Sequence, residues 1–225
     1  LRNAAEFEGK ALGAAGDEAA NAMLISALQA ARPDDAILSE EEKDNAERLA
    51  KERVWIIDPV DGTREYGEAR QDWAVHVAMT VNGAPVLGAV ALPGCDQVLR
   101  SDQPGEVPPA PEVLRMVVSR TRPALEATEV AKALGAELVP MGSAGAKAMA
   151  ILRGEADIYL HSGGQYEWDS CAPAAVALGW GLHCSRIDGS PLVYNQQDVY
   201  MPDLLICRKE HAERVLLEVA ALQRQ

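Results

Sequence analysis

Apolar residues in the first half of the chain occur in short runs and alternations that predict strands. The predicted strands are residues 36–38, 54–58, 73–81, 85–92 and 97–100. The pair Asn82-Gly83 stands between two of these segments and predicts a hairpin. The first half is therefore expected to contain a sheet with one hairpin in it.

Two helices are predicted in the same half. Apolar residues at helical spacing follow Asp17, which stands where an N-cap is expected, and continue to about residue 28. The acidic run after Ser39 predicts a second, charged helix that ends near Arg53, because acids favour a helix N-terminus. Residues 1–16 predict only the end of a helix and a turn over Gly13 to Gly16.

After residue 112 the pattern changes to an alternation of strands and helices. Strands are predicted at 114–119, 137–140, 157–161, 181–186 and 204–207, and helices at 124–134, 143–153, 169–178 and from Glu210. A proline-rich connection over 104–111 separates the two patterns. We predict an N-terminal α+β half over 1–103 and a C-terminal α/β half over 112–225. The alternation in the second half favours the α/β class.

The segment Asp58-Pro59-Val60-Asp61-Gly62-Thr63 follows the most apolar of the predicted strands. Proline cannot donate a hydrogen bond to a sheet, so the strand is expected to end at Asp58. Two carboxylates three residues apart across a turn can converge on one hard cation, with the Val60 carbonyl as a further ligand. Backbone N–H groups and the hydroxyl at Thr63 can meet a phosphate oxygen or a water. The pattern favours a metal site.

Two other interpretations of this turn stay open. Asp-Pro and Asp-Gly are common in turns and helix caps, where the acids have no chemical role. Phosphotransferases that form an aspartyl-phosphate also place acids and a threonine after an apolar strand, but those acids stand two residues apart and share one face. The interval of three, with a proline inside, favours metal ligands over a nucleophile.

Four further residues stand where site residues are expected. Glu40 emerges at the end of a predicted strand, as the first acid of the central turn does. Ser143 opens a helix that contains Lys147, and a helix N-terminus can bind a phosphate. Asp169 precedes an alanine-rich helix, with Pro173 expected in its first turn. The alternative for each is structural: a cap for the acids and the serine, and a solvated surface charge for the lysine.

Composition limits the partners of the chain. Its 225 residues are 48% hydrophobic and only 4% aromatic, which predicts a large core built from alanine, valine and leucine. The 34 acidic and 21 basic residues give a net charge of −13. Polymeric nucleic acid and anionic membranes are poor partners for such a chain. A small phosphorylated molecule is a compatible partner where cations held by the acids supply positive charge.

The four cysteines, Cys95, Cys171, Cys184 and Cys207, show no CxxC spacing and no histidine at zinc-site spacing. We expect buried, reduced thiols in a cytoplasmic protein. No apolar run approaches the roughly 18 residues of a membrane span, and no signal peptide is recognisable. The chain begins at Leu1 rather than methionine, which leaves room for an upstream segment.

Taken together, these motifs resemble the inositol monophosphatase superfamily of lithium-sensitive, magnesium-dependent phosphatases. The matching segments are Ser39-Glu40-Glu41, WIIDPVDGT at 55–63, Gly142-Ser143-Ala144 and Trp168-Asp169. They span essentially the whole chain, and DPxDGT followed far downstream by WD is a specific signal. The stretches LSEE, DGTREY, GSAGAKAMA and DGSPLVYN are most similar to the actinobacterial CysQ branch.

The resemblance implies a layered α-β-α-β-α sandwich of the inositol monophosphatase and fructose-1,6-bisphosphatase type. It implies two or three Mg²⁺ ions, held by Glu40, Asp58, the Val60 carbonyl, Asp61 and Asp169. Mn²⁺ is expected to substitute, and Li⁺ is expected to inhibit. A homodimer is the expectation for oligomeric state.

The resemblance also implies catalytic roles. Thr63, assisted by Glu40, is expected to orient the attacking water, and Asp17 matches the acid that pairs with this threonine. The phosphate ester of a small molecule repels an anionic nucleophile, so its uncatalysed hydrolysis is very slow. Two metal ions roughly 3.5–4 Å apart neutralise the ester and lower the pKa of the water.

Substrate contacts are implied for a further set of residues. The Gly62 and Thr63 amides and Asp169 are expected to lie at the departing phosphate. Ser143 and Lys147 are expected to contact the substrate beyond it, with Lys147 as a partner for a second phosphate.

The CysQ branch implies hydrolysis of 3'-phosphoadenosine 5'-phosphate to AMP and phosphate, in connection with sulfate assimilation. The glutamate that binds inositol hydroxyls in the family falls at Ser162, which argues against inositol phosphates. Fructose-1,6-bisphosphatase or inositol monophosphatase activity is the rival within the enzymes. A non-catalytic phosphonucleotide-binding protein and a calcium-stabilised structural protein are rivals of other classes. Tyr166 and Trp168 are candidates for stacking on a base or for the core.

Overall fold

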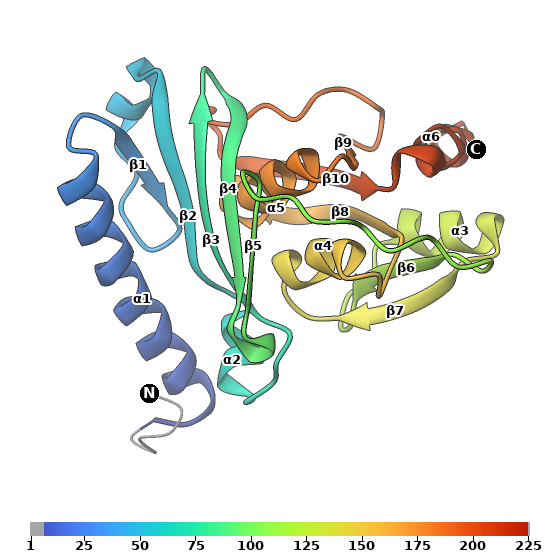
Figure 1. Cartoon of the computed structure of the whole chain (residues 1–225), viewed down its shortest axis with the longest axis horizontal. Helices are drawn as coiled ribbons and strands as arrows, with labels where there is room; N and C mark the ends of the chain where they lie inside the picture. Colours follow the sequence, from blue (N-terminus) through green and yellow to red (C-terminus); the bar gives the residue numbers. More distant parts are fainter. Residues whose placement is uncertain (1–6, 225) are drawn as a thin grey trace.

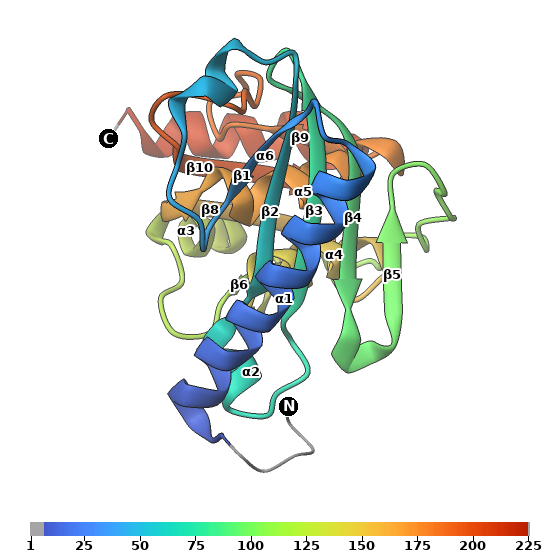
Figure 2. The same ribbon diagram turned by 90° about the vertical axis from the view of Figure 1, so that its left-hand side faces the viewer.

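Two five-stranded sheets alternate with three layers of helices in the described part of the chain, as Figure 1 shows. The computed structural model describes residues 7–224. Helix α1 lies on the outer side of the first sheet, α4 and α5 lie between the sheets, and α3 and α6 lie beyond the second sheet (Figures 1 and 2). The predicted α-β-α-β-α arrangement is therefore confirmed.

The first sheet has the strand order β1-β2-β3-β4-β5. Its strands are β1 (Ala36–Ser39), β2 (Arg53–Asp61), β3 (Ala74–Val81), β4 (Ala84–Leu92) and β5 (Gln97–Arg100). Strand β1 pairs in parallel with β2, and the other pairs are antiparallel. Helix α1 (Gly9–Ala31) packs along β2, and the short α2 (Thr63–Gly67) packs against α1. Two 3₁₀ helices, η2 (Ala46–Ala50) and η3 (Pro93–Cys95), complete this half.

The second sheet has the strand order β7-β6-β8-β10-β9. Its strands are β6 (Arg115–Ser119), β7 (Glu137–Met141), β8 (Ile158–Tyr166), β9 (His183–Ser185) and β10 (Tyr200–Cys207). Strand β6 is parallel to β7 and β8, whereas β10 is antiparallel to β8 and β9. Helices α3 (Leu125–Leu134) and α6 (Lys209–Leu222) cover its outer face and share one apolar cluster with it.

The layer between the sheets consists of α4 (Ala144–Leu152) and α5 (Glu167–Gly179). Both helices are rich in alanine and are buried along most of their length, so the two sheets approach closely. A Cβ atom at Gly88 on β4 would lie 2.7 Å from the Ala175 Cβ atom on α5, so only glycine fits at this contact. The core that results contains residues from both sides of segment 104–111. No helix within residues 7–224 is long and apolar enough to cross a membrane.

The predicted helix over 39–53 was wrong. A turn follows β1, and η2 is the only helical part of this segment in the described chain. The acids are held instead by tertiary contacts, because Asn21 on α1 hydrogen-bonds to Ser39 and Glu42. Long-range contacts have outweighed the local preference of acids for a helix N-terminus.

The predicted turn at Gly13 to Gly16 and the N-cap at Asp17 were also wrong, because α1 begins at Gly9 and includes all of these residues. The two glycines serve close packing. A Cβ atom at Gly13 would lie 2.9 Å from Thr63, and one at Gly16 would lie 2.5 Å from Tyr66. The part of the prediction that concerns residues 1–6 lies outside the described residues.

Three strand and helix limits also differ from the prediction. Strand β2 continues past Asp58, because a bulge accommodates the proline. Strand β8 passes through Gly163-Gly164, predicted as a turn, where its pairing with β10 shifts by one residue. Helix α5 begins at Glu167, which places Pro173 inside the helix rather than in its first turn.

The four cysteines are free thiols. Cys171 and Cys207 are buried as predicted, whereas Cys95 and Cys184 are only half-buried.

Candidate active site

Three carboxylates meet between the sheets. Ligand atoms of Asp58, Asp61 and Asp169 all lie within 4.8 Å of one another. Residues three apart on a regular strand would point to opposite faces of the sheet. The bulge in β2 adds one residue between the two acids, since Asp58 pairs with His76 and Asp61 with Ala74, and this returns both acids to one face. Asp169 reaches the same place from the first turn of α5.

Asp61 is held by the first residues of α4. The Ser143 hydroxyl and the backbone N–H groups of Ala144, at 3.1 Å, and Gly145, at 2.6 Å, donate to its carboxylate. Burial tends to raise the pKa of Asp61, but His76, Ser143 and nearby charge outweigh it and lower the pKa to about 2. Asp61 is therefore ionised at any working pH.

His76 is a site residue that the sequence interpretation missed. It is fully buried, and its Nδ1 donates to the Trp168 carbonyl at 3.0 Å, since a carbonyl can only accept. Its Nε2 lies 3.2 Å from the Asp61 carboxylate. Burial tends to lower the pKa of His76, but Asp61 outweighs it and raises the pKa. A lone histidine within the apolar strand 74–81 was the available signal.

The other acids of the site are less completely paired, and Asp169 also caps α5, because its Oδ2 accepts a hydrogen bond from the Tyr166 backbone N–H at 2.7 Å. Asp58 is 1% exposed, and its Oδ1 is buried without a hydrogen-bond partner. Burial, then Asp61, Glu40 and Asp169, raise the pKa of Asp58 well above its usual value. Burial and Asp61 raise the pKa of Asp169 to about 6. Burial, Asp169 and Asp17 raise the pKa of Glu40 to about 7.

These acids fit a hard cation. The ion pairs of residues 7–224 include none between a lysine or arginine and Asp58, Asp169 or Glu40. Burial and the mutual repulsion of carboxylates without a cation together raise the pKa values of these acids. Oxygen ligands of this kind suit Mg²⁺, Mn²⁺ or Ca²⁺ rather than soft metals.

Glu40 lies beside this group rather than within it. Strand β1 pairs in parallel with β2, with Ser39 opposite Ile57, so the residue after β1 emerges at the same sheet edge as Asp58. The backbone N–H of Glu40 donates to the Ile57 carbonyl at 3.3 Å. Asp58 and Glu40 also influence each other's pKa, which is consistent with neighbouring side chains.

Thr63 and Asp17 form a pair next to the carboxylates. The Thr63 hydroxyl lies 3.2 Å from Asp17 Oδ2 and 3.1 Å from the Val60 carbonyl, and both of these groups accept hydrogen bonds. Asp17 is buried in the middle of α1, and burial and Glu41 raise its pKa to about 6. The structure thus brings the predicted threonine and its predicted acid together.

The residues predicted to contact substrate lie on the α4 side. Gly62 adopts a φ of 89°, and a Cβ atom placed on it would lie 3.2 Å from the Ser143 Cβ. Lys147 is 5% exposed, so the alternative interpretation of this residue as a solvated surface lysine was wrong. Its Nζ donates to the Ser143 carbonyl at 2.8 Å and the Gly142 carbonyl at 3.3 Å. Burial lowers the pKa of Lys147.

Tyr166 and Trp168 stack on each other, with ring centroids 5.1 Å apart and planes 15° apart. Tyr166 is 44% exposed, so this stack reaches the surface. Ser162, the position of the family's inositol-binding glutamate, donates to Glu126.

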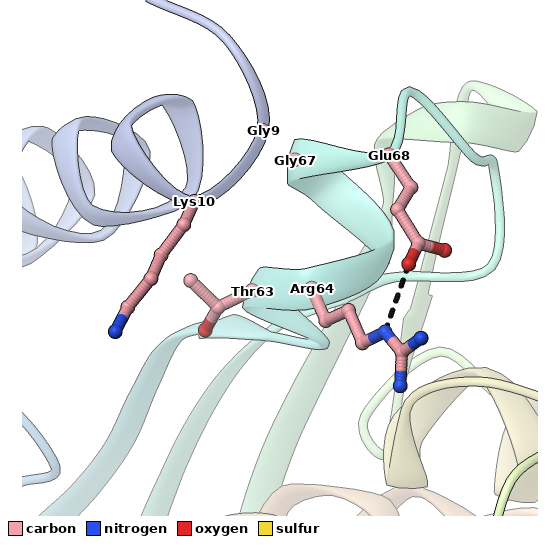
Figure 3. Close-up of a pocket in the computed structure, with 6 residues that line it drawn as sticks. All are labelled: Gly9, Lys10, Thr63, Arg64, Gly67 and Glu68. Atoms are coloured by element: carbon pink, nitrogen blue, oxygen red, sulfur yellow. Dashed lines mark hydrogen bonds and ion pairs between the residues drawn. The ribbon is translucent and has the colours of Figure 1, made fainter.

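Two cavities adjoin the Thr63 turn. One, of about 540 Å³, lies between the first turn of α1 and α2, and its lining includes Lys10, Thr63 and the paired Arg64 and Glu68 (Figure 3). The other, of about 400 Å³, lies between α2, the loop after β6 and the start of α4, and Ser143 and Lys147 line it. The second cavity is therefore the one on the predicted substrate side.

Comparisons with known proteins point to one family. Residues 6–224 match the inositol monophosphatase family. The chain is 52% identical over 219 residues to a Mycobacterium bovis protein named 3'-phosphoadenosine 5'-phosphate phosphatase, covering 93% of this chain and 82% of that protein. It is 29% identical over 205 residues to Escherichia coli K12 3'(2'),5'-bisphosphate nucleotidase CysQ, covering 83% of this chain and 81% of that protein.

The solved structures agree in fold. The inositol monophosphatase from Anabaena has a TM-score of 0.76 at 21% identity, covering 92% of this chain and 87% of that one. CysQ from Bacteroides thetaiotaomicron has a TM-score of 0.71 at 24% identity, covering 82% of each chain.

Proposed function

The chain belongs to the inositol monophosphatase family, and we propose that it hydrolyses 3'-phosphoadenosine 5'-phosphate to AMP and phosphate with the help of Mg²⁺. The observation that carries the proposal is the meeting of Asp58, Asp61 and Asp169 beside the Thr63–Asp17 pair. The name and the 52% identity of the mycobacterial relatives support the choice of substrate.

The cation ligands we propose are the carboxylates of Asp58, Asp61, Asp169 and Glu40 and the Val60 carbonyl. Cations held there would neutralise the phosphate ester and lower the pKa of the attacking water. The protein contributes a rigid frame, because the hydrogen bonds from α4 fix Asp61. Mn²⁺ is proposed as a substitute and Li⁺ as an inhibitor.

Thr63 is proposed to orient the water. A hydroxyl has one proton, and donating it to Asp17 leaves the oxygen lone pairs free to accept a hydrogen bond from water. Glu40, whose backbone N–H bonds to the Ile57 carbonyl next to Asp58, is proposed to assist Thr63 in orienting that water. The backbone N–H groups of Gly62 and Thr63 are proposed to bind the departing phosphate, beside Asp169.

Substrate beyond the reacting phosphate is proposed to lie along Ser143 and Lys147. Inositol phosphates are a weaker candidate, because Ser162 stands where the inositol-binding glutamate is expected and is engaged with Glu126. We also propose a cytoplasmic homodimer.

The test is phosphate release from a panel of substrates with Mg²⁺. The proposal expects 3'-phosphoadenosine 5'-phosphate to have the highest kcat/KM, ahead of fructose 1,6-bisphosphate and inositol 1-phosphate, and expects chelation to abolish turnover. Equal turnover of inositol 1-phosphate would overturn the proposed ranking. Binding of the nucleotide without any release of phosphate would favour a non-catalytic binding protein.

A further inference from the structure

His76 lies on β3, on the face of the first sheet that carries the acids of the site. In the antiparallel pairing of β2 with β3, His76 stands opposite Asp58, and side chains opposite each other in such a pair lie on the same face. Helix α5 packs against both strands. The His76 side chain is fully buried, so its surroundings are groups of the protein rather than solvent.

The imidazole ring of His76 contacts three other elements. Its Nδ1 donates to the Trp168 carbonyl on α5 at 3.0 Å, and its Nε2 lies 3.2 Å from the Asp61 carboxylate on β2. A Cβ atom placed on Gly145 of α4 would lie 2.0 Å from Nε2, so the ring fills the space that a side chain at Gly145 would need. The ring therefore lies between Asp61 and α5, against the first turn of α4.

The two acids that this ring lies between come from different halves of the chain. Asp61 is fixed on β2 by backbone N–H groups of α4. Asp169 directly follows Trp168, and its carboxylate accepts from the Tyr166 backbone N–H at 2.7 Å, which fixes it to the first turn of α5. The spacing between the two carboxylates therefore depends on where the first turn of α5 lies relative to the first sheet.

Other hydrogen bonds hold the first turn of α5 on the side of the second sheet. The Glu167 carboxylate accepts from the backbone N–H groups of Asn195 and Gln196, each at 2.7 Å. The Glu167 backbone N–H donates to the Val199 carbonyl at 2.9 Å. These contacts tie the turn to the loop before β10. The hydrogen bond from His76 ties the same turn to the first sheet, beside Asp61.

We propose that His76 is a positioning residue that sets the spacing between Asp61 and Asp169 and thereby the affinity of the site for a divalent cation. The inference rests on the cation site of the proposed function. His76 is not itself a ligand, because both ring nitrogens face groups of the protein. The role requires both contacts, since a side chain held at one end alone would leave the spacing unset.

The experiment measures Mn²⁺ affinity by electron paramagnetic resonance, which requires no turnover, in variants that each keep one contact. Asparagine places its amide near the position of Nδ1, so His76→Asn keeps a donor for the Trp168 carbonyl. Glutamine places its amide near Nε2, so His76→Gln keeps a donor for Asp61. Both variants are expected to bind Mn²⁺ about 10-fold more weakly or worse. At saturating Mg²⁺, kcat and the KM for substrate are expected to stay within about threefold of the parent, because His76 acts through the metal site.

Thr80→Val is the matched control. Thr80 lies on the same face of β3, is also fully buried, and donates to the Val54 carbonyl on β2 at 3.2 Å. The valine keeps the volume and removes a hydrogen bond between the same two strands, away from the acids. This variant is expected to have a lower Tm and an unchanged Mn²⁺ affinity, which separates a general loss of stability from a change in the spacing of the carboxylates.

A further variant keeps His76 and displaces its ring. Gly145→Ala places a Cβ atom where Nε2 lies, so the ring has to move away from Asp61. We expect this variant to weaken Mn²⁺ binding. Combined with His76→Asn it is expected to add little to the loss, because both changes break the same contact. Additive losses would contradict the proposed role of the ring.

A Mn²⁺ affinity equal to that of the parent in either His76→Asn or His76→Gln would overturn the inference, because one contact would then be sufficient. An equal loss in Thr80→Val would also overturn it. If the parent binds Mn²⁺ but releases no phosphate, the proposed function fails, and the Mn²⁺ titrations still decide the role of His76. If the parent binds no Mn²⁺ among these acids, both the cation site and the inference fail.

Discussion

The two sides of the central turn differ in how completely their charges are paired. On the α4 side, Asp61 receives hydrogen bonds from a helix N-terminus and lies beside His76, and its pKa falls to about 2. At the β2 end of the turn, Asp58 is buried with an unpartnered oxygen, and its pKa is raised well above the usual value. Two acids three residues apart therefore have opposite environments.

This difference means that Asp61 is held in place by the protein itself, whereas Asp58 depends on a bound cation. A carboxylate that accepts hydrogen bonds from its neighbours, such as Asp61, stays ionised and fixed in place even before a cation binds. A buried carboxylate among other acids is destabilising until a cation arrives. We therefore expect Asp61 to stabilise the protein with or without metal, and Asp58 to stabilise it only when metal is bound.

The largest effects are expected when the two acids are changed separately. Asp58→Asn and Asp61→Asn are each expected to lower activity by more than about 100-fold. A change to a residue that only hydrogen-bonds to a metal ligand already costs roughly 10- to 100-fold, and these two acids are proposed as ligands themselves. In the presence of a chelator, the Tm values of the two variants are expected to shift in opposite directions from that of the parent protein. Asp61→Asn is expected to lower the free energy of unfolding by roughly 3 kcal/mol, which corresponds to a fall in Tm of about 6–12 °C. The reason is that it breaks the buried pair with His76. Asp58→Asn is expected to melt higher than the parent, because the cost of either charging or protonating a buried, crowded carboxylate is gone.

Thermal melts of both variants in chelator and phosphate-release assays with Mg²⁺ make this comparison. A fall in Tm for both variants would contradict the expected difference between Asp58 and Asp61.

Thr63→Val is expected to lower kcat by about 100-fold or more, with KM and Tm close to those of the parent. The valine keeps the shape of the side chain but removes the hydroxyl that lies between Asp17 and the Val60 carbonyl. Steady-state kinetics measure the change, and Thr63→Ser is the control that should keep most of the activity. Unchanged turnover in Thr63→Val would remove the threonine from the mechanism.

Asn21→Ala is expected to raise the Mg²⁺ concentration for half-maximal activity by about 10- to 100-fold. Asn21 accepts from Ser39 at 2.8 Å and donates to Glu42 at 2.7 Å, so it holds the residues on both sides of Glu40. Mn²⁺ binding followed by electron paramagnetic resonance gives a readout independent of turnover. The matched control is Asn45→Ala, which removes an exposed cap of η2 from the same loop. Equal metal affinity in both variants would refute a role for Asn21.

The smallest effect expected is a pH dependence of stability in chelator. The pKa values of Asp17 and Asp169 rise from 3.8 to about 6, and that of Glu40 rises from 4.5 to about 7. The folded state therefore binds more protons than the unfolded state between about pH 4 and pH 7, and stability falls as pH rises through this window. In chelator, Tm is expected to be a few degrees lower at pH 7.5 than at pH 5, and Mg²⁺ is expected to make this difference smaller. A Tm that rises with pH in chelator contradicts the crowding of these acids.

The motifs of the sequence were sufficient to predict the family and the layered fold. Apolar runs such as 54–58 and 114–119 lie in strands, because burial favours the same residues that the pattern selects. Asp58, Asp61 and Asp169 could be named because DPxDGT and WD are specific. Their meeting could not be derived from spacing alone, since it depends on the bulge in β2 and on the position of α5.

The predictions that were wrong depended on local preference where long-range contacts decide. The acids after Ser39 favour a helix start, but Asn21 on another helix holds them in a turn. Gly13 and Gly16 suggested a turn, whereas they lie in α1 because Thr63 and Tyr66 pack against them. The pairing of Arg120 with Glu65 is a contact between residues 55 positions apart, which no local pattern indicates.

Anomalous diffraction from crystals grown with Mn²⁺ tests the central claim most directly. The account predicts strong peaks between the carboxylates of Asp58, Asp61 and Asp169, with Glu40 turned toward at least one of them. Well-ordered crystals at saturating Mn²⁺ that show no peak among these carboxylates, or peaks only at surface acids, would contradict it.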